Sequence, residues 1–165
     1  MITFREVSSL EDIEALAKKA DEIWHEYFPG IITVEQIDYM VDLFLSPKAI
    51  KEEIADGYIF YSALNEDGRM IGFAVFKPED KRLFISKLYV EKSSRGKGYG
   101  SAMFDKAIKV AREHNLSKMY LTVNKGNESS INIYKHKGFE IIDSVVNDIG
   151  GGFVMDDYIF EAKVN

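Results

Sequence analysis

The chain has 165 residues, of which 46% are hydrophobic, 29% charged and 13% aromatic, as expected for a folded protein. This length predicts a single domain over residues 1–165. The sequence contains no cysteine, which excludes a disulfide framework and any thiolate metal site. His25, His114 and His136 are scattered along the chain, so no metal site is expected.

Charge and hydropathy exclude further classes of protein. The 27 acidic and 21 basic residues give a net charge of −6, which disfavours a nucleic-acid-binding protein, since such proteins are normally basic. No apolar run approaches the ~20 residues that a membrane helix needs, so no membrane partner is expected. The start of the chain, Met1 to Arg5, lacks the features of a secretory signal. We therefore expect a cytoplasmic protein.

The first third of the chain predicts one strand and three helices. Residues 2–7 are typical of a strand, and Ser9 with Asp12 has the spacing of a capping box for a helix that ends before Pro29. A second helix is expected from Thr33 to about residue 45, and a third starts at Pro47 and ends before residue 57.

The rest of the chain predicts mainly strands. The expected strands are residues 58–64, 70–76, 83–90, 118–123, 139–146 and 153–162. Residues 65–68 are typical of a hairpin turn, and residues 147–152 are expected to form a loop. A helix is expected around residues 103–111, and a short one over residues 127–137. The pattern indicates an α/β domain of about seven strands.

The most informative segment is a glycine-rich loop between the strand at 83–90 and the following helix. Gly96, Gly98 and Gly100 alternate there, and such a loop directs backbone N–H groups and a helix start toward a phosphate. From Lys87 to Lys97 there are four basic residues and one acidic residue, which also favours an anion.

Two familiar phosphate loops do not fit this segment. A P-loop requires glycine where Glu91 stands and serine or threonine where Gly98 stands. A dinucleotide-binding loop that starts at Gly96 requires a third glycine where Ser101 stands. The remaining pattern, Arg95-x-x-Gly98-x-Gly100 after a strand, resembles the pyrophosphate loop of the GNAT N-acetyltransferases.

A second segment strengthens this resemblance. Asn127-x-x-Ser130, then Tyr134, and then Gly138-Phe139 follow the strand at 118–123, as in the second signature of the GNAT family. The two segments together cover about residues 83–139. On these motifs the chain is identified as a member of the GNAT family.

The resemblance implies a fold and a cofactor. The implied GNAT fold is α/β, with a single mixed, mostly antiparallel seven-stranded sheet and about four or five helices. A central parallel pair, here residues 83–90 and 118–123, splays apart to bind acetyl-CoA.

The resemblance also implies roles for individual residues. The backbone of Leu88 and Val90 would bind the pantetheine and acetyl groups, and the loop from Arg95 to Ser101 would cradle the pyrophosphate. Asn127 would contact the pantetheine arm, although a plain N-cap role is equally open. The residues assigned to cofactor binding are Leu88, Tyr89, Val90, Arg95, Gly96, Lys97, Gly98, Tyr99, Gly100, Ser101 and Asn127.

Tyr134 stands where the family places its general acid, which protonates the departing thiolate of CoA. The alternative is that Tyr134 only packs on the sheet.

The general base is less evident. Some relatives carry a glutamate on the third core strand, where this chain has Phe84 and Ser86, and Ser86 could order a water molecule. Asp156, Asp157, Glu26 and His25 are the other candidates for the base.

The expected function is therefore direct transfer of an acetyl group from acetyl-CoA to a primary amine, because no cysteine is present to carry the acetyl group. The acidic composition favours a cationic acceptor, such as a polyamine. The aromatic-rich first helices and the acidic end at Asp156 and Asp157 loosely resemble the diamine and polyamine enzymes and other small-amine members of the family. A peptide or protein amine as acceptor, a non-catalytic acyl-CoA-binding regulatory module and a homodimer remain open alternatives.

Overall fold

The computed structural model describes residues 1–164 and shows a seven-stranded sheet in the order β1-β2-β3-β4-β5-β7-β6. The strands are β1 (Thr3–Glu6), β2 (Ile59–Leu64), β3 (Met70–Pro78), β4 (Leu83–Val90), β5 (Lys118–Asn124), β6 (Glu140–Gly150) and β7 (Phe153–Lys163). The α-helices are α1 (Leu10–Tyr27), α2 (Val34–Leu45), α3 (Pro47–Ala55), α4 (Tyr99–Glu113) and α5 (Glu128–His136), and a short 3₁₀ helix, η1, spans Lys92–Ser94.

Local sequence signals explain where the first helices begin. The side chains of Ser9, Thr33 and Ser46 each accept a hydrogen bond from the backbone N–H three residues later, which caps α1, α2 and α3. Pro47 occupies the first turn of α3, where its missing N–H leaves no hydrogen bond unmade.

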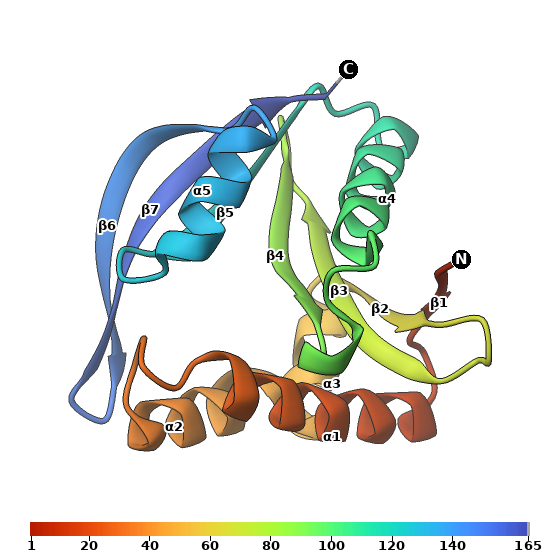
Figure 1. Ribbon diagram of the computed structural model, residues 1–165, viewed down its shortest axis with the longest axis horizontal. Helices are drawn as coiled ribbons and strands as arrows, with labels where there is room; N and C mark the ends of the chain where they lie inside the picture. The colour runs from red at the N-terminus through yellow and green to blue at the C-terminus, as the bar shows by residue number, and fades with distance from the viewer. Residues whose placement is uncertain (165) are drawn as a thin grey trace.

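The sheet is mixed, because β4 and β5 are parallel whereas the other neighbouring pairs are antiparallel. The two parallel strands are paired only at Leu83–Met119 and Phe84–Tyr120, although both continue well beyond these residues. Figure 1 shows β4 and β5 diverging, with α4 beside β4 and α5 beside β5 and β7. The predicted seven-stranded mixed sheet with a splayed parallel pair is therefore confirmed.

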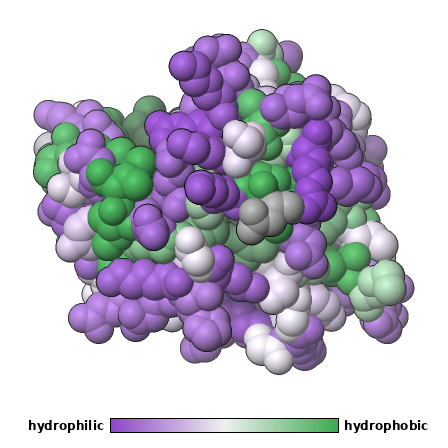
Figure 2. Space-filling model, turned by 90° about the horizontal axis from the view of Figure 1, so that it is seen from above, coloured by the Kyte–Doolittle hydropathy of each residue, from purple (hydrophilic) through white to green (hydrophobic). Residues whose placement is uncertain are grey.

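Two hydrophobic cores lie on opposite faces of the sheet. One face packs against α1, α2 and α3 through residues such as Leu16, Ile37 and Phe73. The other packs against α4 through residues such as Phe76, Ala107 and Phe160. The outer surface seen in Figure 2 is largely hydrophilic, with hydrophobic residues in separate patches. None of the helices described is long and apolar enough to span a membrane.

The C-terminal hairpin departs from the sequence expectation. Residues 147–152 were expected to form a loop, but β6 continues to Gly150 and pairs with β7 as far as Phe153. Tyr39 on α2 holds this end of the hairpin, because its hydroxyl donates to the carbonyl of Ile149 at 2.6 Å and its ring lies 5.2 Å from that of Phe153. Pairing with β7 and packing against Tyr39 thus extend β6 beyond the residues whose local sequence pattern indicates a strand.

Candidate active site

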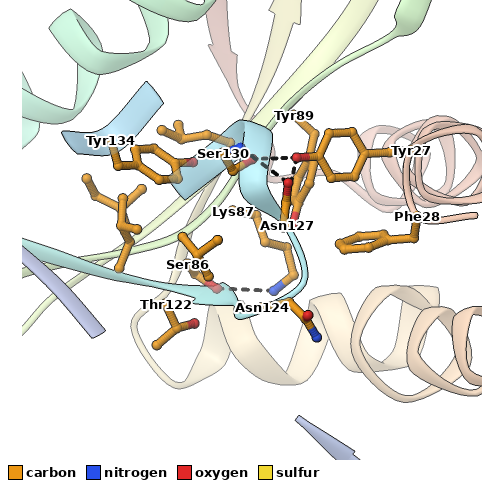
Figure 3. A pocket seen from close by; sticks show the side chains of 14 residues that line it. Tyr27, Phe28, Ser86, Lys87, Tyr89, Thr122, Asn124, Asn127, Ser130 and Tyr134 are labelled. Atoms are coloured by element: carbon orange, nitrogen blue, oxygen red, sulfur yellow. Dashed lines mark hydrogen bonds between the residues drawn. The ribbon is translucent and has the colours of Figure 1, made fainter. Parts of the chain in front are cut away.

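The divergence of β4 and β5 creates a pocket in the middle of the sheet, which we call the central pocket (Figure 3). Its walls are residues 85–89 of β4 and 121–124 of β5, directly after the last paired residues. Tyr27 and Phe28 close it from α1, and Asn127, Ser130 and Tyr134 close it from the segment around α5.

A β-bulge shapes the β4 wall of this pocket. Ile85 pairs with Phe76 and Lys87 pairs with Val75, so Ser86 is an extra residue without a partner on β3. Because side chains alternate along a strand, the extra residue moves Lys87 to the face covered by α1, α2 and α3. Lys87, which the sequence grouped with the phosphate loop, is therefore buried on the opposite side of the sheet from α4.

On the other side, the central pocket continues into a cleft between α4 and α5, which we call the α4–α5 cleft, with a volume of about 320 Å³. The glycine-rich loop forms one wall. Gly96 and Gly98 have φ values of +78° and +80°, a left-handed conformation that favours glycine. Gly98 is the N-cap of α4 and has no side chain to satisfy the first N–H groups of the helix. These groups are available to an anion.

An ionic network around the buried Glu91 anchors the start of this loop. Glu91 accepts hydrogen bonds from Arg69 at 2.6 Å and from the hydroxyl of Ser94 at 2.8 Å, and it pairs with Lys19 of α1 at 2.7 Å. Burial alone would raise the pKa of Glu91, but these three partners lower it to about 2. Glu91 thus remains charged and ties the loop to α1 and to β3.

A hydrogen-bonded bridge links α1 to the start of α5. Asn127 caps α5 by accepting from the N–H of Ser130 at 3.2 Å, and its side-chain N–H₂ donates to the hydroxyl of Tyr27 at 2.8 Å. The hydroxyl groups of Tyr27 and Ser130 lie 2.5 Å apart (Figure 3). The guanidinium of Arg95 lies 5.1 Å from the centroid of the Tyr27 ring. Asn127 therefore both caps a helix and lines the pocket.

Tyr134 lies where the central pocket meets the α4–α5 cleft, and it lines both. Its ring packs against Phe104, Phe139 and Phe160, with centroids 5.6, 5.8 and 6.0 Å away. Burial and the neighbouring Tyr27 raise the pKa of Tyr134, so its hydroxyl keeps its proton at neutral pH. The aromatic contacts fix the ring, and within residues 1–164 the hydroxyl makes no hydrogen bond.

On the opposite face, the central pocket opens into a second cavity of about 370 Å³ beneath α1, α2 and α3, which we call the helical cavity. The two share Phe28, Ser86, Lys87, Tyr89, Thr122 and Asn124. Asn147, Ile149 and Met155 of the β6–β7 hairpin close the outer side. Cleft, pocket and cavity thus adjoin one another through shared lining residues, and we call the three together the passage through the sheet.

Two carboxyl groups and one amino group line the helical cavity, those of Glu53, Asp157 and Lys87. Burial raises the pKa of Glu53, and nearby Lys87 partly opposes this rise; one carboxylate oxygen of Glu53 is buried without a hydrogen-bond partner in the described structure. Burial lowers the pKa of Lys87, whose ammonium donates to the hydroxyl of Ser86 at 3.1 Å. Burial and then Asp156 raise the pKa of Asp157 to about 6, against the effect of Lys125.

Most residues that the sequence assigned to the site line this passage. The α4–α5 cleft is lined by Leu88, Tyr89, Val90, Arg95, Gly96, Gly98, Tyr99, Gly100 and Tyr134, and Asn127 lines the central pocket. Lys97 and Ser101 are exposed and are not among the lining residues, and the hydroxyl of Ser101 accepts a hydrogen bond from Lys137 at 3.0 Å.

The candidate bases are widely separated. Asp157 and Ser86 line the helical cavity, together with Phe84. His25 lies in an outer groove between α1 and α2, where its ring bonds to Asp38.

Sequence reasoning missed several lining residues, including Tyr27, Glu53 and Lys87 as parts of a pocket. Tyr27 and Glu53 lie near the C-terminal ends of α1 and α3, and only helix packing brings them to the site. The Lys87 side chain is redirected by a bulge that carries no sequence signature. A lysine within an apolar strand was the one available signal.

The passage, the glycine-rich loop and the segment that starts at Asn127 together define an acyl-CoA-dependent transferase. Comparison with known proteins gives the family. The chain matches the acetyltransferase (GNAT) family over residues 17–139, more than half its length, and therefore belongs to that family.

Individual relatives agree with this assignment. The chain is 24% identical to a spermidine N(1)-acetyltransferase from Thermoplasma acidophilum over 152 residues, which covers 90% of this chain and 92% of the relative. It is 27% identical to an uncharacterised N-acetyltransferase from Mycobacterium bovis over 133 residues, or 80% and 85% of the two chains. The crystal structure of PaiA N-acetyltransferase from Thermoplasma acidophilum in complex with coenzyme A has a TM-score of 0.81 and 25% identity, with 99% of each chain covered.

These findings confirm the predicted enzyme class. The protein is an acetyl-CoA-dependent N-acetyltransferase, and its second substrate is an amine.

Proposed function

We propose that this enzyme acetylates a primary amine of a small cationic acceptor, of the diamine or polyamine class, by direct attack in a ternary complex. The observation that carries the proposal is the passage, in which the central pocket adjoins a cleft suited to CoA on one face and a cavity with two carboxyl groups on the other. The similarity to a spermidine acetyltransferase supports the same acceptor class.

In this proposal the α4–α5 cleft holds CoA. The backbone N–H groups between Arg95 and Ser101 bind the pyrophosphate, supported by the positive end of α4. The open loop fits this role, because nothing lies within 4 Å of the Cβ position at Gly96, Gly98 or Gly100. The pantetheine arm passes Asn127 and pairs with β4 at Leu88 and Val90, where β4 is no longer paired with β5, placing the thioester in the central pocket.

Tyr134 acts as the general acid in this arrangement. The acceptor nitrogen attacks the thioester carbonyl, and the C–S bond of the resulting adduct breaks. The departing thiolate then takes the phenolic proton of Tyr134. The position of Tyr134, at the junction of the cleft and the central pocket, supports this role.

The helical cavity supports a small cationic acceptor. The lining carries two carboxyl groups, those of Glu53 and Asp157, and one amino group, that of Lys87, so it has an acidic balance. Aromatic rings, including those of Trp24 and Phe44, offer apolar surface to a methylene chain and attract cations. The β6–β7 hairpin restricts the volume to about 370 Å³, which suits a small molecule better than a protein segment.

The unpartnered oxygen of Glu53 suits a second ammonium of the acceptor. A charged hydrogen bond of this kind is worth about 1.5–3 kcal/mol, so Glu53→Gln should raise KM for a diamine on the order of tenfold or more. KM for a monoamine of similar size should change little. Glu52, which is exposed on the same helix, provides the matched control in Glu52→Gln.

A panel of acceptors tests the acceptor class. Purified enzyme, acetyl-CoA and each amine are combined, the release of free thiol is followed, and the products are identified by mass spectrometry. The proposal expects diamines and polyamines to be acetylated in preference to neutral or anionic amines. Turnover of neutral or anionic amines, with none of polyamines, would contradict it.

A further inference from the structure

We propose that Asp157 is the general base that removes a proton from the ammonium of the acceptor. This inference rests on the proposed acetyl transfer and assigns its missing proton acceptor. Asp157 lies on β7 and pairs with Asn124, the last residue of β5, at the edge of the central pocket. It lines the helical cavity and is only 4% exposed.

The carboxylate of Asp157 has no hydrogen bond or ion pair with any side chain in residues 1–164. The carboxylate oxygens of Asp157 are not among the fully enclosed side-chain atoms that lack a partner in the described residues, so they stay open to the helical cavity, where a ligand can supply the missing partner. The neighbouring Asp156 differs, because its carboxylate pairs with Lys125 at 2.8 Å and its side chain is 50% exposed. Since successive strand residues face opposite sides of the sheet, only Asp157 lines the cavity.

The other candidate bases are engaged elsewhere. The ring of His25 bonds to Asp38 and to the backbone of Asp21 in the outer groove. Glu26 accepts from the backbone N–H of Lys92. Asp157 therefore has both access to the cavity and a free carboxylate.

The charged and titratable groups around Asp157 set its basicity. Burial and Asp156 raise the pKa of Asp157 to about 6, and Lys125 lowers it. Tyr89 on β4 also faces it, and Lys87 and Glu53 line the same cavity. A carboxylate with this pKa is ionised at neutral pH and is a stronger base than an exposed aspartate.

The proposed reaction conserves every bond and proton. The Asp157 carboxylate accepts one proton from the acceptor ammonium, and the freed nitrogen lone pair forms a C–N bond with the thioester carbonyl. The C–S bond breaks, and the thiolate accepts a proton from the Tyr134 hydroxyl. The amide nitrogen loses its remaining extra proton to solvent, and the two residues return to their starting protonation states by exchange with solvent.

Asp157→Asn is the test, with Asp156→Asn as the adjacent control. At neutral pH and saturating substrates, Asp157→Asn should lower kcat by about 10²–10⁴-fold, the usual range for acid–base catalysis. CoA affinity should stay unchanged, and Asp156→Asn should keep nearly wild-type kcat. Since Asp157→Asn removes a buried unpartnered charge, its Tm should equal or exceed that of the wild type.

The pH dependence separates a base from a binding residue. For the wild type, kcat at saturating acceptor should fall at low pH, because Asp157, whose pKa is raised to about 6, becomes protonated. In Asp157→Asn this limb should disappear, and the deficit should shrink at high pH as free amine becomes abundant. A residue that only attracts the cation would instead raise KM and leave kcat unchanged, which would overturn the proposal.

Two further outcomes also test the assignment of Asp157 as the base. If Lys87→Met removes the acidic limb and Asp157→Asn retains it, then Lys87 is the base and the proposal is wrong. Asp157→Ser provides a second variant without a carboxylate, should the asparagine variant fold poorly. If the wild type acetylates no cationic amine, the proposed acceptor class is wrong. If the wild type acetylates cationic amines and Asp157→Asn keeps the full kcat, only the assignment of Asp157 as the base is wrong.

Discussion

Replacing Tyr134 by phenylalanine isolates the proposed acid step, because it removes one hydroxyl and keeps the ring. The ring contacts with Phe104, Phe139 and Phe160 remain, and within residues 1–164 the hydroxyl makes no hydrogen bond that would be lost. We therefore expect the free energy of unfolding to change by less than about 0.5 kcal/mol. The affinity for CoA should also be unchanged.

The catalytic loss should be much larger than the loss of stability. General acid catalysis contributes about 10²–10⁴-fold, which corresponds to a barrier increase of about 2.7–5.4 kcal/mol. The assay is a single-turnover measurement with acetyl-CoA bound and the acceptor saturating, so that chemistry limits the observed rate. Calorimetry with CoA verifies that binding is matched between the variant and the wild type.

Tyr120→Phe is the matched control. The hydroxyl of Tyr120 donates to Glu79 at 2.7 Å, and Tyr120 does not line the central pocket, the α4–α5 cleft or the helical cavity. This variant should lose about 1 kcal/mol of stability with the hydrogen bond, and keep its turnover. If Tyr134→Phe retains the wild-type single-turnover rate, Tyr134 is structural and the proton comes from another group.

Three further predictions concern the loop and its support. Gly98→Val places a β-branched residue at a φ of +80° and should weaken CoA binding by at least about tenfold. Gly100 does not have a positive φ, so Gly100→Val should weaken CoA binding less, and calorimetry compares the affinities of the two variants. Gly72→Ala places a Cβ 2.3 Å from the carbonyl oxygen of Tyr89 and should lower the stability by about 1–3 kcal/mol in denaturant unfolding; an unchanged midpoint would contradict this close packing. The pKa of Glu91 is lowered from 4.5 to about 2 in the folded state, so its charge stabilises the fold above pH 4.5, and this stabilisation should be lost as the pH falls toward 2. In Glu91→Gln, the free energy of unfolding should fall over that pH range by up to about 3 kcal/mol less than in the wild type. An equal fall in both proteins would contradict the network.

The sequence predicted those parts of the fold that depend on local chemistry. Helix caps such as Ser9 and Thr33 lie next to the groups they bind, so their spacing is visible in the sequence. The end of β6 was missed, because Gly150 belongs to the strand only through pairing with Phe153 and packing against Tyr39. Contacts between residues distant in the sequence have no local signal.

The same distinction applies to the site. The loop from Arg95 to Gly100 is continuous in sequence and could be recognised, whereas the helical cavity combines three helices, two central strands and a hairpin. Lys87 shows the limit most clearly. Simple alternation along β4 places it with Ile85 on the α4 side, and the bulge at Ser86 turns it to the helical cavity. Asp157 was one of several candidate bases, and the structure separates it from Asp156 by its burial at the helical cavity and by the ion pair that Asp156 forms with Lys125.

The account depends on adjoining cavities that hold both substrates at once, and a conjugate of CoA with a diamine tests this most directly. In the conjugate, the CoA sulfur is joined through an acetyl bridge to one nitrogen of the diamine. Calorimetry should show one conjugate per chain, bound at least about 10²-fold more tightly than CoA, and more tightly than a conjugate with an uncharged alkyl chain of equal length. Equal affinities for CoA and both conjugates would contradict the account.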